Sequence, residues 1–257
     1  MIDVVFINPA ASEEIYQDLH KDYSAIEPPT WSLLLAQATR SKGFQVSIFD
    51  PLAERLSISE SVGRLKNIKA RVYCFVVYGQ NPNSGTVNMH GATLLSKALK
   101  VADSTVKTVF VGSHMSALPL EVLEFEDSVD FVLTNEGVYA IQNLLKVDLD
   151  SLEDLEKVKG IGFRKEGIPY LTEPERIVPQ ERMDLDLPGY AWDLLPFNKK
   201  PLDLYRSHFW HAEYKHENRT PFAAIYTSLG CQFGCDFCMI NILNRDDNDP
   251  IGEASNY

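Results

Sequence analysis

The chain has 257 residues, of which 45% are hydrophobic, so it is long enough for one large domain or two small ones with a sizeable core. Its formal net charge of −12 argues against a nucleic-acid partner, because phosphate contacts require a basic face. No apolar run reaches the roughly 18–20 residues that would span a bilayer, and no basic leader precedes the first strand pattern. We therefore expect a cytoplasmic protein without a membrane span.

Residues 1–147 alternate between strand and helix patterns. Short apolar runs predict strands at 4–7, 45–49, 72–78, 108–111 and 131–133. Helical spacing predicts helices at 31–42, 59–66, 86–101, 118–125 and 138–145. Strands that are apolar on both faces and alternate with helices form a parallel sheet that is covered on two sides. The predicted fold class is therefore α/β, with a doubly wound sheet of Rossmann or flavodoxin type over residues 1–147.

The pattern changes after residue 147. Residues 160–171 predict a β-hairpin with its turn at Glu166-Gly167. An irregular, proline-punctuated stretch follows, with Pro174, Pro179, Pro188, Pro196 and Pro201. We interpret 148–220 as a hairpin and linker between two domains. A strand predicted at 222–226 then leads into a cysteine-rich loop, so 221–257 begins a second domain.

Polar and small residues recur where the predicted strands end, which is where ligands bind in open α/β sheets. No dinucleotide-binding glycine fingerprint follows the first strand, and the phosphate-binding P-loop motif is absent. The pattern predicts a ligand of unknown identity, although turn residues would give a similar pattern. The candidate binding residues are Asn8, Pro9, Tyr78, Gly79, Gln80, Gly112, Ser113, His114, Glu136 and Gly137.

Three cysteines, Cys231, Cys235 and Cys238, form a C-x3-C-x2-C loop. Three thiolates suit an iron–sulfur cluster with one open iron, or a zinc site that recruits a fourth ligand. His208, His211 or His216 could be that fourth ligand, although histidines packed in the linker are the simpler interpretation. Three unligated thiols would be exposed and easily oxidised. The fourth cysteine, Cys74, lies in a predicted strand and is interpreted as a buried apolar residue.

The cysteine loop, together with the aromatic Phe237 before its last cysteine, resembles the signature of radical S-adenosylmethionine (SAM) enzymes. The resemblance implies a [4Fe–4S] cluster on the three cysteines, SAM bound at the open iron, and Phe237 near the adenine. It also implies a reductant of flavodoxin or ferredoxin type as a partner.

The N-terminal part resembles the cobalamin (B12)-binding domain that often precedes a radical SAM domain. The resemblance rests on Asn8-Pro9, on residues 27–30 before the first helix, on the run 112–119 and on Asn135-Glu136-Gly137. It implies cobalamin at the candidate binding residues, but without the D-x-H-x-x-G motif whose histidine ligates cobalt in many B12 proteins.

Few residues follow Cys238, so we expect a radical SAM barrel that is incomplete in this chain and an active site that the chain alone does not complete. The predicted function is the N-terminal part of an enzyme that cleaves SAM with its cluster and uses cobalamin for methyl transfer or a radical rearrangement. The alternative is a stand-alone cobalamin-binding or interaction module with a vestigial or zinc-binding cysteine tail.

Overall fold

The computed structural model describes residues 1–9, 19, 23–78, 85–230, 233, 235 and 238. Seven strands form one sheet in the order β2-β1-β3-β4-β5-β6-β7. They are β1 (Ile2–Ile7), β2 (Val46–Phe49), β3 (Ala70–Val77), β4 (Thr108–Gly112), β5 (Phe131–Leu133), β6 (Ile161–Lys165) and β7 (Ile168–Leu171). Strands β1 to β5 are parallel, whereas β6 and β7 are antiparallel. The predicted α/β class, with its mostly parallel sheet, is confirmed.

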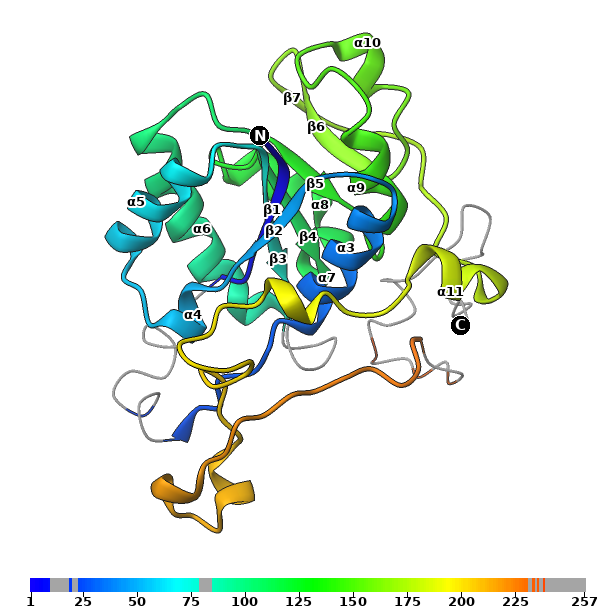
Figure 1. The fold of residues 1–257 in the computed structure, drawn as a ribbon. Helices are drawn as coiled ribbons and strands as arrows, with labels where there is room; N and C mark the ends of the chain where they lie inside the picture. Colours follow the sequence, from blue (N-terminus) through cyan, green and yellow to red (C-terminus); the bar gives the residue numbers. More distant parts are fainter. Residues whose placement is uncertain are drawn as a thin grey trace.

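Helices cover both faces of the sheet (Figure 1). One face packs against α3 (Thr30–Ser41) and α9 (Val138–Leu144), and the other against α5 (Ile58–Ile68), α6 (Gly85–Ala102) and α8 (Pro119–Phe125). Successive residues of each strand supply the two cores, since Phe6 and Cys74 face α3 while Val5 and Phe75 face α6. Cys74 is fully buried, as predicted, and burial raises the pKa of its thiol.

Short helices complete the fold at positions where the sequence shows no full helical period. They are α4 (Pro51–Glu54), α7 (Ser113–Ala117), α10 (Leu152–Leu155) and α11 (Met183–Asp186). Local capping explains two boundaries. Asp50 accepts a hydrogen bond from the backbone N–H of Ala53 at the start of α4, and Ser57 and Glu60 form a reciprocal capping box at the start of α5.

The predicted hairpin is confirmed, and it extends the sheet. Glu166 and Gly167 both have positive φ angles, of 53° and 83°, which is the geometry of a two-residue type I′ turn. Strand β6 pairs with β5, so the hairpin lies at the sheet's edge. Pro169 sits on β7 opposite Arg164. In a two-residue hairpin the pair that closes the turn is hydrogen-bonded, so the next position, Pro169, faces the open side of β7.

The linker after β7 packs against the sheet and α3. Its buried residues Val178, Leu187 and Ala191 belong to the core on the α3 side. Tyr205 is also fully buried, in a small cluster with Leu33. In Figure 1 the linker, coloured yellow to orange, passes from α11 across the lower end of the sheet, where the carboxyl ends of the parallel strands lie.

The strand predicted at 222–226 is wrong. Residues 221–226 have no regular secondary structure. The apolar pattern favours a strand, but a strand forms only where a neighbour can accept its backbone hydrogen bonds.

Candidate functional site

The parallel strands bring the predicted strand-end residues together where the carboxyl ends of the strands lie. We call this end of the sheet the carboxyl edge, as distinct from the lateral border at β7. Asn8 follows β1, Tyr78 follows β3, Gly112 ends β4, and Glu136 follows β5. These strands are neighbours in the sheet, so their ends form a continuous edge. Pro9 is buried beside Asn8. Gly79 and Gln80 lie outside the described residues.

Gly112 and Ser113 form the centre of this edge. A side chain at Gly112 would place its Cβ 2.1 Å from the carbonyl oxygen of Val77, so only glycine fits between β3 and β4 here. The hydroxyl of Ser113 is buried and has no hydrogen-bond partner within the described residues. A Cβ on Gly85 would lie 2.0 Å from the Ser113 Oγ atom. This edge therefore contains a buried hydroxyl that packs against the backbone of Gly85 and has no hydrogen-bond partner among the described residues.

Two aromatic side chains line the same edge. The Tyr78 hydroxyl donates to the carbonyl of Asn135 at 3.1 Å, and the Trp31 Nε1 donates to the carbonyl of Glu136 at 3.1 Å. Their ring centroids lie 5.0 Å apart. Burial raises the pKa of Tyr78, so its phenol stays protonated. Trp31, which the sequence analysis did not select, therefore belongs to the site.

Glu136 and Gly137 hold the chain at the end of β5. One carboxylate oxygen of Glu136 accepts the backbone N–H of Val178 at 2.6 Å, which fixes the linker against the edge. Gly137 begins α9 with a φ of +77°, a conformation that suits glycine. His114, in α7, is half-buried, and burial lowers the pKa of its imidazole, which favours the neutral form at pH 7.

A buried carboxyl group lies behind Asn8. Asp50 accepts hydrogen bonds from the Asn8 Nδ2 at 2.9 Å, from the Tyr205 hydroxyl at 2.9 Å and from the Ala53 N–H at 3.2 Å. Burial raises the pKa of Asp50 to about 6 despite these three donors. Asp50 is not among the residues that the sequence predicts for the site. The missed signal was an acidic residue directly after an apolar run.

The chain approaching the cysteine triplet passes along the same edge. The Thr30 hydroxyl at the start of α3 lies 3.4 Å from the carbonyl oxygen of Ala224 and 3.3 Å from that of Pro28, so the two carbonyls share its one proton. The rings of Trp31 and Tyr226 lie 6.2 Å apart. Leu229 packs against the core on the α3 side. The residues just before Cys231 therefore lie beside the strand-end residues that the sequence predicts as a ligand site.

The triplet itself is only partly described. Cys235 is exposed and Cys238 half-buried, and the N–H of Cys238 donates to the carbonyl of Cys235 at 3.0 Å. Cys231 and Phe237 lie outside the described residues. The residues that the structure describes contain no group of three or more metal-ligating side chains.

The linker histidines have partners of their own. His208 Nε2 lies 2.6 Å from a carboxylate oxygen of Glu27, and its ring stacks on Trp210 with centroids 4.2 Å apart. The ring of His211 lies 6.0 Å from that of Phe222. These contacts support the interpretation of His208 and His211 as packed linker residues.

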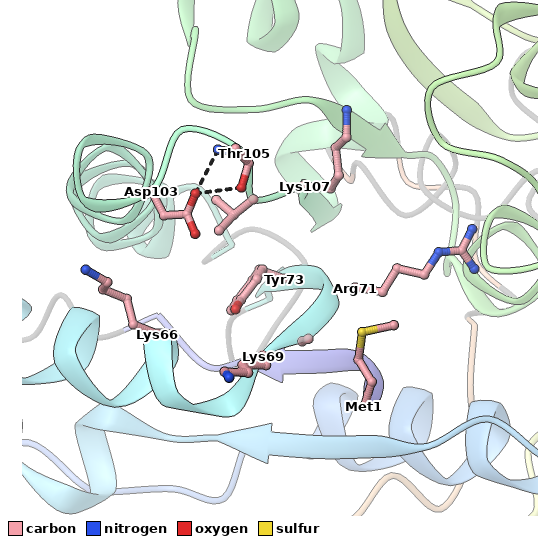
Figure 2. Close-up of a pocket in the computed structure, with 10 residues that line it drawn as sticks. Met1, Lys66, Lys69, Arg71, Tyr73, Asp103, Thr105 and Lys107 are labelled. Carbon is pink, nitrogen blue, oxygen red and sulfur yellow. Dashed lines mark hydrogen bonds between the residues drawn. The ribbon is translucent and has the colours of Figure 1, made fainter.

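A separate hollow of about 260 Å³ lies at the opposite, amino edge of the sheet (Figure 2). Lysines and an arginine line it, yet two of these cations are already used. Arg71 donates to the carbonyl of Leu145 at 2.6 Å, and Lys107 pairs with Asp150. Figure 2 shows both side chains turned away from Tyr73 at the centre of the hollow. This hollow is therefore not the candidate site.

Within the described residues, no helix is both long and apolar enough to cross a bilayer.

Comparisons with known proteins give one relative in sequence and several in structure. No protein-family profile matches the chain. Over 211 residues it is 26% identical to PH0819, an uncharacterized methyltransferase of Pyrococcus horikoshii, and the match covers 82% of this chain and 40% of that protein.

Among solved structures, the cobalamin-dependent SAM radical enzyme OxsB, with aqua-cobalamin and SAM bound, superposes with a TM-score of 0.55 and 15% identity over 76% of this chain and 24% of its own. The radical SAM methyltransferase TsrM of Kitasatospora setae, with cobalamin and a [4Fe–4S] cluster bound, superposes with a TM-score of 0.50 and 15% identity over 70% of this chain and 30% of its own. The chain thus spans less than half the length of each of these proteins, and it shares with the two solved enzymes their α/β fold.

Proposed function

We propose that this chain is the cofactor-binding, N-terminal part of a cobalamin-dependent radical SAM methyltransferase. The observation that carries the proposal is the convergence of two features at one edge of the sheet. The strand-end residues gather there, and contacts from Thr30 and Trp31 bring the approach to Cys231 to the same edge. The likeness in sequence to a methyltransferase and in fold to the methyltransferase TsrM favours methyl transfer over rearrangement.

The residues at this edge fit a large flat cofactor. The buried hydroxyl of Ser113 has no hydrogen-bond partner among the described residues. Gly85 and Gly112 have no side chain, so neighbouring atoms pack directly against their backbone. Tyr78 and Trp31 supply aromatic surface. Tyr78, Ser113 and His114 would hold cobalamin, which supplies a transferable methyl group when bound. The sequence of these 257 residues lacks the D-x-H-x-x-G motif whose histidine ligates cobalt in many B12 proteins, so these residues would hold the cofactor without that histidine.

The cysteine triplet fits a cluster better than zinc. Cys231, Cys235 and Cys238 would hold a [4Fe–4S] cluster, which supplies the electron that cleaves SAM when it is bound and reduced. Phe237 would contact the SAM adenine. Two of the histidines that could complete a zinc site, His208 and His211, contact other linker residues. A flavodoxin- or ferredoxin-type protein would supply the electrons.

Anaerobic reconstitution with iron and sulfide tests the cluster. The wild-type chain should become brown and contain about four irons. Cys235→Ala should lose most of both signals, whereas Cys74→Ala, which removes the buried thiol of β3, should keep them. Zinc without iron in protein purified anaerobically would instead favour the alternative of a cobalamin-binding module with a zinc tail.

Equilibrium dialysis with hydroxocobalamin tests the other half of the proposal. The whole chain should bind, and Ser113→Ala should bind about fivefold more weakly, because one hydrogen bond contributes about 1 kcal/mol. Ser96→Ala is a matched control, since the Ser96 hydroxyl is also buried but bonds to Ser128 on another part of the fold. Equal, negligible retention of cobalamin by all three proteins would contradict the proposal.

A further inference from the structure

We infer that Tyr190 is a positioning residue that fixes the backbone at Tyr226 and thereby the direction in which the chain enters the cysteine triplet. The restraint on Tyr226 does not depend on the proposed function. The expected effect on the cluster does, and in that respect the inference rests on the proposed function. The contacts that carry it lie wholly within the described residues.

Tyr190 binds both backbone groups of one residue. Its phenolic oxygen accepts the N–H of Tyr226 at 2.8 Å, and its hydroxyl donates to the carbonyl of the same residue at 3.0 Å. A phenol can do both at once because its oxygen is donor and acceptor. Two hydrogen bonds from one fixed atom restrain the position and the orientation of that residue.

The segment needs such a partner because no strand lies beside it. Residues 221–226 have no regular secondary structure, so their N–H and C=O groups lack a β-ladder. Tyr190 supplies at Tyr226 what a neighbouring strand would supply. Nearby, the Thr30 hydroxyl contacts the carbonyl of Ala224 at 3.4 Å, and the Trp31 ring packs against that of Tyr226.

Tyr190 is itself held by the rigid part of the fold. The next residue, Ala191, is fully buried, and its N–H donates to the carbonyl of Leu33 in α3 at 3.2 Å. The Tyr190 ring lies 5.4 Å from that of Trp192. These contacts on 224–226 thus come from α3 itself or from a linker residue that is attached to α3. The first residues of α3 lie at the carboxyl edge of the sheet.

The position of Tyr226 gives these contacts their consequence. Tyr226 precedes Cys231 by five residues, and Gly230 in between has a φ of +75°, which turns the chain sharply. Only four residues separate Tyr226 from Cys231, so we expect a shift of the backbone at Tyr226 to change the path of the chain toward the triplet. Loss of the Tyr190 hydroxyl should loosen the approach without unfolding the sheet.

Hydrogen–deuterium exchange of the metal-free whole chain tests the contact directly. Tyr190→Phe keeps the ring but removes the oxygen, so peptides spanning 222–230 should exchange about tenfold faster, as expected for the loss of two hydrogen bonds in a surface segment. Tyr73→Phe is the matched control, because it loses a hydroxyl bonded to the carbonyl of Leu65 at 3.3 Å on the other face of the sheet and touches neither this segment nor the linker. Equal exchange in Tyr190→Phe and wild type would overturn the inference.

The second measurement separates this inference from the proposed function. In the reconstituted chain, Tyr190→Phe should change the electron paramagnetic resonance spectrum of the reduced cluster, whereas Tyr73→Phe should not. An unchanged spectrum beside faster exchange would overturn the role at the cluster. If wild type takes up no cluster but Tyr190→Phe still exchanges faster, the contact stands and the proposed function fails.

Discussion

Single polar side chains hold this molecule together at points that apolar patterning does not reveal. Asp50 lies at the end of β2, yet it joins Asn8 from β1 and Tyr205 from the linker. Burial destabilises the charged carboxylate more than the three hydrogen-bond donors stabilise it, and the pKa of Asp50 is therefore raised. Asp50 therefore binds a proton more tightly in the folded chain than in the unfolded chain.

This raised pKa predicts how stability depends on pH. Below pH 4 the group is protonated in both states, and as pH rises through about 6 the folded state loses about 3 kcal/mol relative to the unfolded state. Asp50→Asn resembles the protonated form and lacks this dependence. The difference in unfolding free energy, wild type minus Asp50→Asn, should therefore fall as pH rises from about 4 to about 6 and then level off. Urea unfolding over that range measures it, and two parallel curves would contradict the assignment.

At the scale of elements, the linker is anchored to the helices on one face of the sheet. Asp186 in α11 accepts hydrogen bonds from Lys42 at 2.7 Å, from Arg182 at 2.7 Å and from the Tyr139 hydroxyl at 2.6 Å. These donors, Arg182 foremost, hold the pKa of Asp186 well below its usual range. A lowered pKa stabilises the fold above the pKa of the unfolded chain, and this contribution is lost as pH falls.

Two linker aspartates offer a matched comparison. Asp186 is buried, whereas Asp193 pairs with Arg40 with 64% of its side chain exposed. Asp186→Asn should lower the free energy of unfolding by about 1–3 kcal/mol at pH 7, because two cations and a phenol lose their charged partner. Asp193→Asn should change it by less than about 0.5 kcal/mol. Chemical unfolding monitored by tryptophan fluorescence measures both, and equal losses would refute the proposed anchor.

The sequence predicts an element well when the residues that determine it are close together in the chain. The parallel strands and the hairpin are predicted because continuous apolar runs and the Glu166-Gly167 turn act over a few residues. The edge residues Asn8 and Gly112 follow from those strands. The path of the linker is not predictable in this way, since the Asp50–Tyr205 contact joins positions 155 residues apart. The strand expected at 222–226 fails for the same reason, because pairing depends on distant chain.

At the scale of the whole molecule, the sheet, the hairpin and the linker share one core. Ile161 and Phe163 of β6, and Val178, Leu187 and Ala191 of the linker, are buried in the core on the α3 side. The sequence pattern changes at residue 147. Because the core is shared across this position, a fragment of residues 1–147 would expose the apolar surface that these later residues cover.

Two fragments test this shared core. Residues 1–220 keep the hairpin and the linker, and they should unfold in one cooperative step. Residues 1–147 lack both, and they should bind a hydrophobic dye and unfold at a temperature at least about 10 °C lower, since several buried side chains each contribute about 1.5–3 kcal/mol. Differential scanning calorimetry compares them. Matching transitions would show that residues 1–147 form an independent domain.

The proline on β7 bears on how copies of this chain meet. Pro169 carries no amide hydrogen at a position that faces away from β6, and the exposed Ile168 precedes it. Without that donor, an incoming strand from another copy cannot complete a ladder along this border. Strand β7 is thereby protected against pairing with a strand of another copy along its outer side.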